Sequence, residues 1–150
     1  MTVSGKIAAH LFASTTGTDS DWIVKVIDVY PEKQAAGADA KMGGYELMIA
    51  GDVMRGRYRN SLEKPQAIEP GAVVEYEIGF PGNDHVFLKG HRIMVQVQST
   101  WFPVIDRNPQ RFVPNIYLAH ESDFQAATQR VFRSGGHASY IGMPVVEAAR

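Results

Sequence analysis

The chain has 150 residues, 45% of them hydrophobic and 21% charged, which is typical of one soluble globular domain. Its formal net charge of −1 excludes a strongly basic surface for nucleic acid or an anionic membrane. The absence of cysteine excludes a disulfide framework, a cysteine-ligated zinc ion and a thiol nucleophile.

Runs of alternating or β-branched apolar residues predict an all-β chain of roughly eight strands. Fourteen glycines and eight prolines fit many short strands joined by turns better than a helical bundle. We see no internal repeat and no domain boundary, so residues 1–150 are expected to form a single β-sandwich with long loops and little helix. The expected strands are residues 3–13, 22–30, 45–58, 73–80, 85–88, 93–98, 129–133 and 139–146.

Several of these elements carry a more specific expectation. Residues 22–30 are apolar almost throughout, which favours a strand buried on both faces. A loop is expected over residues 31–44, and a bend in the next strand at Gly51 or Gly56. The sequence Pro-Gly-Asn-Asp at 81–84 predicts a turn between two strands.

The stretch 89–109 is the part around which the rest of the chain is interpreted. In its first half Ile93, Val95 and Val97 share one face of a half-buried strand. Its second half, 101–109, is aromatic and interrupted by proline, and the region up to residue 123 is irregular. This pattern predicts a jelly-roll sandwich with one elaborated end. Towards the C-terminus, residues 134–137 predict a hairpin.

The sequence holds no recognisable catalytic motif. A serine hydrolase of the α/β type needs Gly-x-Ser-x-Gly at a strand-to-helix turn, and this pattern is absent. A serine paired in space with a histidine would depend on geometry, and we do not expect one. The five histidines are scattered at His10, His85, His91, His120 and His137.

Two short acidic clusters are the only local candidates for metal binding. Residues 19–21 (Asp-Ser-Asp) lack the glycine and distal glutamate of an EF-hand, and residues 120–123 (His-Glu-Ser-Asp) lack the spacing of a zinc site. We therefore expect no metal or cofactor, and interpret both clusters as turn formers and a cap for a helical turn over 122–128.

The aromatic residues and arginines allow two interpretations each. The aromatics could line a sugar-binding surface, although packing in the core or at an interface is the favoured interpretation. The arginines could bind carboxylates as forks, although a solvated face or salt bridges within a larger protein is favoured. The aromatics are Trp22, Tyr45, Tyr58, Trp101 and Phe102, and the arginines are Arg55, Arg57, Arg59 and Arg107.

Four stretches carry a resemblance to a known family. They are 12–22 (FASTTGTDSDW), 24–31 (VKVIDVYP), 51–61 (GDVMRGRYRNS) and 89–109 (KGHRIMVQVQSTWFPVIDRNP). In this order they resemble the C-terminal domain of the serine hydrolases that include X-Pro dipeptidyl-peptidase, cocaine esterase, glutaryl acylases and α-amino-acid ester hydrolases. The α-amino-acid ester hydrolase branch is the most similar.

The resemblance implies a galactose-binding-like jelly roll packed on an α/β-hydrolase domain. The catalytic triad and the oxyanion-hole tyrosine of that family belong to the hydrolase domain, so no catalytic residue is carried over to this chain. The expected role is a non-catalytic support for the hydrolase domain and its substrate cleft. Parents in this family act on X-Pro peptides, esters or β-lactam side chains, and which of these applies is left open.

Family members have strand sequence before the segment that matches the first residues here. We therefore expect the domain to lack one or more initial strands, and to self-associate through an open strand edge. The first residues carry no signal peptide and no apolar run spans a membrane, so the chain as written is expected in the cytoplasm. Exported parents occur in the family, which leaves the compartment of the parent open.

The first choices for an interdomain or cleft-wall surface are Trp101, Phe102, Asp106 and Arg107, because interfaces combine aromatic anchors with paired charges. The alternative function is a stand-alone carbohydrate- or ligand-binding sandwich. An independently acting hydrolase is the least favoured interpretation, because the nucleophile motif is missing.

Overall fold

The computed structural model describes residues 1–33 and 42–146, and nearly all regular structure in it is β. Part of the loop expected over residues 31–44 lies outside the described residues. The strands are β1 Thr2–Thr15, β2 Asp21–Val29, β3 Glu46–Arg55, β4 Val74–Val86, β5 Arg92–Gln98, β6 Gln129–Val131, β7 Arg133–Ser134, β8 His137–Ala138, β9 Tyr140–Gly142 and β10 Val145–Val146. Three short 3-10 helices are η2 Gly56–Tyr58, η3 Ile116–Leu118 and η4 Glu121–Asp123.

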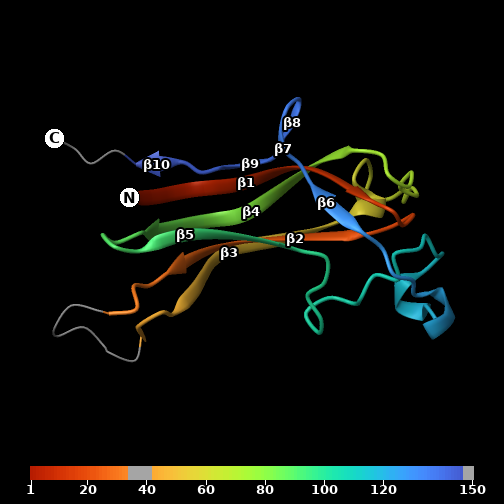
Figure 1. The fold of residues 1–150 in the computed structure, drawn as a ribbon, viewed down its shortest axis with the longest axis horizontal. Coiled ribbons are helices and arrows are strands. Elements are labelled where there is room, and N and C mark those ends of the chain that lie inside the picture. The colour runs from red at the N-terminus through yellow and green to blue at the C-terminus, as the bar shows by residue number, and fades with distance from the viewer. Residues whose placement is uncertain (34–41, 147–150) are drawn as a thin grey trace.

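Two antiparallel sheets face each other and confirm the predicted β-sandwich (Figure 1). In the first sheet β1 pairs with β4 along one edge, and with β10, β9 and β6 in turn along the other. In the second sheet β2 lies between β3 and β5. The first and last described strands therefore belong to one sheet.

The core between the sheets follows from the alternation in β1. Val3, Ile7, Ala9, Leu11 and Ala13 are all buried, as their spacing of two residues predicts. Every residue of β2 except Lys25 is also buried, which confirms that this strand is covered on both faces. The other core residues come from the facing strands and from the segment after β4: Trp22, Val24, Val26, Ala50, Tyr76, Ile78, Phe80 and Phe87.

The turn predicted at 81–84 is wrong. Strand β4 continues through these residues, and Gly82 to Val86 pair with Lys6 to Thr2 of β1. The register shifts between Lys6 and Ala8, so that Phe80 and Pro81 both lie opposite Ile7. A bulge of this kind accepts proline, because the extra residue lies outside the ladder of hydrogen bonds.

The expected strand over 45–58 ends earlier than predicted. It stops at Arg55 and is followed by η2, in which Gly56 and Tyr58 lie. The irregularity in β3 lies at Ile49, which is left out of the register opposite Val26 and Ile27, so the bend expected at Gly51 or Gly56 is not where the ladder shifts.

The C-terminal segment is more broken than its sequence suggests. The hairpin predicted at 134–137 is confirmed as β7 paired with β8, but its flanking strands are split into β6, β9 and β10. The helical turn expected over 122–128 is limited to η4, whose N-cap is His120. Among the described residues no helix is long and apolar enough to cross a membrane.

A buried carboxylate ties the two sheets together at the end of the sandwich where β2 ends. Asp28 of β2 is hydrogen-bonded to His85 Nε2 of β4 at 2.9 Å and to His91 Nδ1, just before β5, at 2.8 Å. The ring of His91 packs on Tyr30, with 4.4 Å between ring centroids. Asp28 thus cross-links the two sheets through its two histidine partners.

The packing predicts a large loss of stability on truncation of Trp22, which is 1% exposed and packs against Tyr76 with 5.6 Å between ring centroids. Trp22→Ala is expected to lower the free energy of unfolding by about 3–5 kcal/mol in urea titrations. The control is Leu62→Ala, at a side chain that is 83% exposed. It should change that free energy by less than about 0.5 kcal/mol, and similar losses in both variants would contradict this account of the core.

Candidate interdomain surface

Parts of three connections meet at one end of the sandwich, which we call the loop end. It consists of residues 15–20, 55–59 and 99–128, and Figure 1 shows the later part of 99–128, in cyan and blue, beyond the ends of the sheets. Backbone hydrogen bonds join the segments, from Thr16 N to Thr128 O and from Thr18 N to Gln110 O, both at 3.1 Å. Three of the four family-like stretches therefore reach the same place.

A buried ion pair holds the first two segments. Arg57 Nε donates to Asp19 Oδ2 at 2.7 Å, and the two residues are 3% and 0% exposed. The other oxygen of Asp19 accepts from Ser20 N at 2.9 Å. The guanidinium also lies 4.7 Å from the ring centre of Phe112. The favoured interpretation of the arginines was a solvated face or a salt bridge, and for Arg57 the salt bridge is the one present.

A second buried carboxylate binds the third segment. Asp21 Oδ1 accepts from Asn108 Nδ2 at 2.9 Å, and Asp21 Oδ2 lies 3.5 Å from Arg55 Nε. Burial raises the pKa of Asp21 from 3.8 to about 6, because desolvation outweighs the hydrogen bond from Asn108 and the attraction of Arg55. Arg55 in turn donates to the backbone oxygen of Asp106 at 3.1 Å.

The close approach of two loops depends on Gly17. A Cβ atom at this position would lie 2.2 Å from the backbone oxygen of Gln110, so a larger residue would force the loops apart. The contact is reinforced by a hydrogen bond from Phe112 N to Thr18 Oγ1 at 2.8 Å. Irregular loops are thus fixed in position by backbone contact and buried charge.

The four residues expected at an interdomain surface all lie on the loop end, in different environments. Phe102 is 67% exposed, whereas Trp101 is half-buried under Lys25, whose Nζ lies 4.4 Å from the ring centre. The guanidinium carbon of Arg107 lies 5.9 Å from the ring centre of Phe102. Asp106 Oδ2 lies 3.6 Å from Nη2 of Arg55, the last residue of β3, so this ion pair joins the loop to the second sheet.

Exposed apolar side chains extend this surface beyond the four residues expected from sequence. The side chains of Val104, Tyr117 and Leu118 are 65%, 80% and 65% exposed. The ring centre of Phe124 lies 5.4 Å from the guanidinium carbon of Arg107. Sequence reasoning missed these residues because they come from a region without periodicity, and the only signal was their apolar character in a polar loop.

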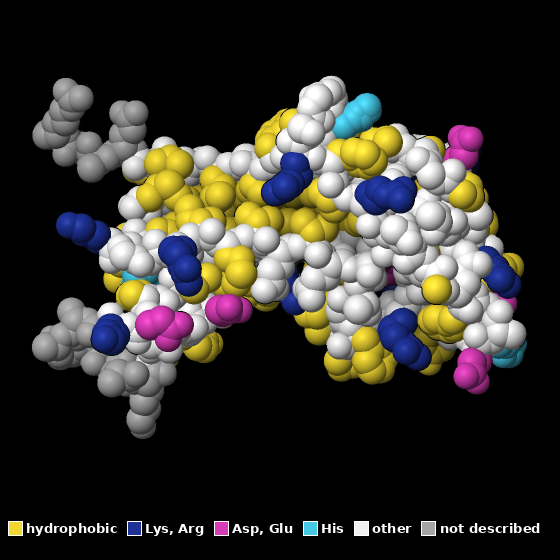
Figure 2. Space-filling view, in the orientation of Figure 1, with side chains coloured by type: hydrophobic (Ala, Val, Ile, Leu, Met, Phe, Trp, Pro, Cys, Tyr) yellow, Lys and Arg dark blue, Asp and Glu magenta, His cyan; other side chains and the backbone are white. Residues whose placement is uncertain are grey.

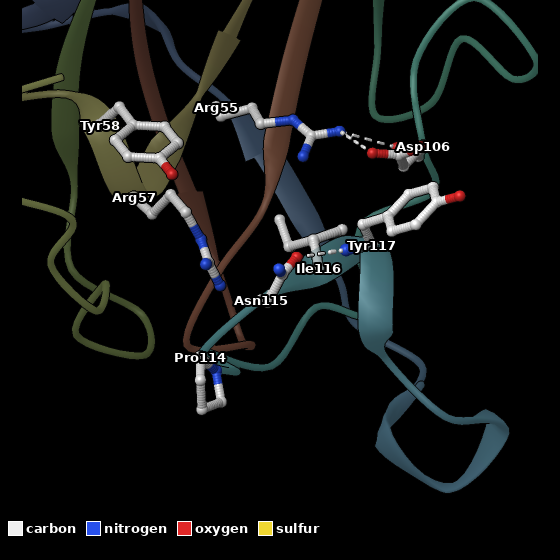
Figure 3. A pocket seen from close by; sticks show the side chains of 8 residues that line it. All are labelled: Arg55, Arg57, Tyr58, Asp106, Pro114, Asn115, Ile116 and Tyr117. Carbon is white, nitrogen blue, oxygen red and sulfur yellow. Dashed lines mark hydrogen bonds and ion pairs between the residues drawn. The ribbon is translucent and has the colours of Figure 1, made fainter. Parts of the chain in front are cut away.

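A cavity of about 230 Å³ opens on the loop end (Figure 3). Figure 3 shows Arg55 and Asp106 joined across its rim, with Tyr117 beside them. Nη2 of Arg57 is buried without a hydrogen-bond partner among the described residues. The lining is mostly polar or charged, with Pro114 and Ile116 as its aliphatic members: Arg55, Arg57, Tyr58, Asp106, Pro114, Asn115, Ile116 and Tyr117.

The remaining polar clusters have structural partners. His10 lies 3.9 Å from Glu75, and Asp123 Oδ2 accepts from His120 N at 2.9 Å, the capping role expected for that cluster. Arg59 donates to the backbone oxygens of Gly56, Gln66 and Ala67. Within residues 1–33 and 42–146 no group of three or more His, Asp or Glu side chains could hold a metal ion.

The arrangement of the loop end suits binding of another surface.

The raised pKa of Asp21 predicts a pH dependence of stability. Because the folded-state pKa of about 6 exceeds the unfolded-state value of 3.8, burying the ionised carboxylate costs stability above pH 6, and this cost disappears as the pH falls below 3.8. Relative to Asp21→Asn, the wild-type free energy of unfolding should fall by up to about 3 kcal/mol from pH ~4 to pH ~7. Urea titrations at several pH values measure this difference, and a constant difference would contradict it.

Comparison with known proteins shows the family of this chain. Residues 1–142 match the family described as the X-Pro dipeptidyl-peptidase C-terminal non-catalytic domain. The chain is 34% identical over 147 residues to cocaine esterase from Rhodococcus sp. (strain MB1 Bresler), covering 97% of this chain and 23% of the esterase.

Two solved structures are similar over 97% of this chain and 24% of their own length. One is an aminopeptidase from a marine sediment archaeon, Thaumarchaeota archaeon, with a TM-score of 0.93 and 47% identity. The other is an α-amino acid ester hydrolase, with a TM-score of 0.90 and 48% identity. The chain thus spans about a quarter of the length of these relatives.

Proposed function

Because the chain belongs to the family of X-Pro dipeptidyl-peptidase C-terminal non-catalytic domains, we propose that it supports the α/β-hydrolase domain of a larger serine hydrolase through its loop end. In the relatives the matching part is a minor share of a longer chain, which implies linkage to a catalytic domain. The parent is proposed to hydrolyse or transfer acyl groups, as the names of its relatives suggest.

The observation that carries the proposal is the composition of the loop end. Exposed aromatic and aliphatic side chains surround arginines whose positions are fixed by buried carboxylates. Aromatic residues and arginine are enriched at interfaces, and a rigid surface loses little conformational entropy on docking. Phe102, Arg107 and Phe124 form the part of this surface in which one guanidinium lies near two aromatic rings.

A stand-alone carbohydrate-binding module has less support. Trp22, one of the aromatics considered for a sugar platform, lies in the core, and Trp101 is covered by Lys25. The exposed aromatics of the loop end therefore do not include a tryptophan with a fully free face.

Substitution of the most exposed expected residue tests the docking role. In the complete hydrolase polypeptide Phe102→Ala should weaken docking by about 2 kcal/mol, because buried aromatic anchors dominate interface energies. Calorimetry and limited proteolysis should then show earlier separation of the domains, together with altered kinetics. The matched control is Tyr45→Ala, at a 45% exposed side chain beside the opposite end of β3. Unchanged stability and kinetics in both Phe102→Ala and Trp101→Ala would refute the proposal.

The chain by itself is further proposed to self-associate through the outer edge of β5. Among the described residues no strand pairs with that edge, and an uncovered strand edge beside apolar surface favours association. Sedimentation velocity over a wide range of protein concentration should show a mass above 16.6 kDa that rises with concentration. A monomer at every concentration would contradict this expectation.

A further inference from the structure

A second hollow of the loop end, a groove of about 600 Å³, lies apart from the cavity drawn in Figure 3 and shares no lining residue with it. Figure 2 shows hydrophobic, basic and acidic side chains close together at this end of the molecule, on the right of the view. The groove is lined by Arg107, Ala119, Glu121 and Phe124. It therefore offers one positive and one negative charge beside apolar surface.

Arg107 differs from the other arginines of the loop end, because its charge has no partner in the described part of the chain. No hydrogen bond or ion pair with its guanidinium is formed by residues 1–33 or 42–146. The other four each contact a carboxylate or another oxygen acceptor: Arg55, Arg57, Arg59 and Arg111. The positive charge of Arg107 is thus available to a ligand.

Aromatic rings flank this charge. The guanidinium carbon of Arg107 lies 5.9 Å from the ring centre of Phe102 and 5.4 Å from that of Phe124. Such rings attract a cation and displace water from its faces, and an ion pair in a less aqueous setting is screened less. The edge of a guanidinium can still bind a carboxylate with two N–H groups while its face contacts a ring.

The chain beside Arg107 is anchored. The next residue, Asn108, is 6% exposed, and its Nδ2 donates to Asp21 Oδ1 at 2.9 Å. Its Oδ1 accepts from Gln110 N at 2.8 Å. A ligand that binds Arg107 therefore has little backbone to order, which favours binding.

The distribution of charge makes this groove, rather than the cavity of Figure 3, the place for an anion. The arginines that line that cavity, Arg55 and Arg57, already face carboxylates of the chain. Glu121 lines the groove but forms no ion pair with Arg107. It lowers the affinity of the groove for an anion without neutralising the guanidinium.

We propose that the groove binds a polypeptide segment through a carboxylate side chain, which Arg107 holds while apolar neighbours of that side chain cover Ala119 and Phe124. That the segment belongs to the parent hydrolase rests on the proposed function. The volume of the groove lies within the range of about 300–1,000 Å³ over which protein sites enclose small ligands, so a few side chains of one segment fit.

Three capped tripeptides test the chemistry of the segment on this chain alone. Each has leucine on both sides of a central residue, which is glutamate, glutamine or lysine. ¹⁵N–¹H spectra at low protein concentration follow the Nε–Hε signal of Arg107 and the backbone amide signal of Phe124. The glutamate peptide should half-saturate these shifts at about 1–10 mM, and should bind about three- to tenfold more tightly than the glutamine peptide.

Substitutions of exposed side chains connect this preference to the groove. Arg107→Gln should abolish the preference for glutamate over glutamine, and Glu121→Gln should raise the affinity for the glutamate peptide by about twofold. The matched control is Arg111→Gln, at an exposed arginine that donates to Gln125 Oε1 at 3.4 Å, and it should keep the preference. The amide of Phe124 reports binding in all three variants, whose melting temperatures should match that of the wild type.

Three results would overturn the proposal. Equal binding of the glutamate and glutamine peptides would show that no carboxylate is selected, and a preference that survives Arg107→Gln would place the carboxylate elsewhere. Tightest binding of the lysine peptide would assign the groove to a cation held by Glu121.

The complete hydrolase polypeptide separates this inference from docking itself. There Arg107→Gln should lower the stability of the docked domains by an amount that shrinks as salt concentration rises, whereas the loss caused by Phe102→Ala should persist. A loss with Phe102→Ala alone would reject the carboxylate and leave docking by the loop end in place. Selective peptide binding by the chain without an effect of either variant in the hydrolase would reject docking and support the groove as a carboxylate site.

Discussion

The loop end of this sandwich depends on carboxylates that are buried against arginines. Residues 99–128 contain little regular structure, so the positions of their side chains rely on Asp19 with Arg57 and on Asp21 with Arg55 and Asn108. Taking charges out of water is costly, and mutual attraction with hydrogen bonds offsets that cost only when the geometry is good. The raised pKa of Asp21 indicates that its hydrogen bond from Asn108 and its attraction to Arg55 do not fully offset the cost of burying its charge. The loop end is therefore held in one conformation at some expense of stability.

Local sequence patterns predict some parts of the fold, and long-range pairing decides the others. Alternation in β1 and the continuous apolar run in β2 report burial directly, so both strands and the core were predicted from local pattern. The segment 81–84 has strong turn character, yet pairing with residues 2–6 keeps it in β4, and local chemistry cannot reveal that long-range partner. The break of the C-terminal segment into β6, β9 and β10 likewise depends on its path along β1.

The candidate surface shows a similar division. The aromatic and charged loop at 101–107 was identified from composition, and Phe102 with Arg107 does present an exposed contact pair. The burial of Arg57 and Asp19 could not be identified, because a charged residue in a polar motif is usually solvated and their pairing joins positions 38 residues apart. The residues that hold the loop end come from three different family-like stretches, so no single stretch reveals their pairing. The charged residues, the glycine and the asparagine in these stretches contact one another or a neighbouring loop where the stretches meet.

The pairing of β1 along both of its edges has a consequence for the order of events during synthesis. One edge waits for β4, residues 74–86, and the other for strands that begin at residue 129. After β4 is made, the other edge of this central strand still lacks its partners until residues 129–146 are synthesised. Folding dominated by such distant pairings is slow. One edge of β1 thus stays open until the last strands of the domain are made, and this edge is where protection by chaperones is needed longest.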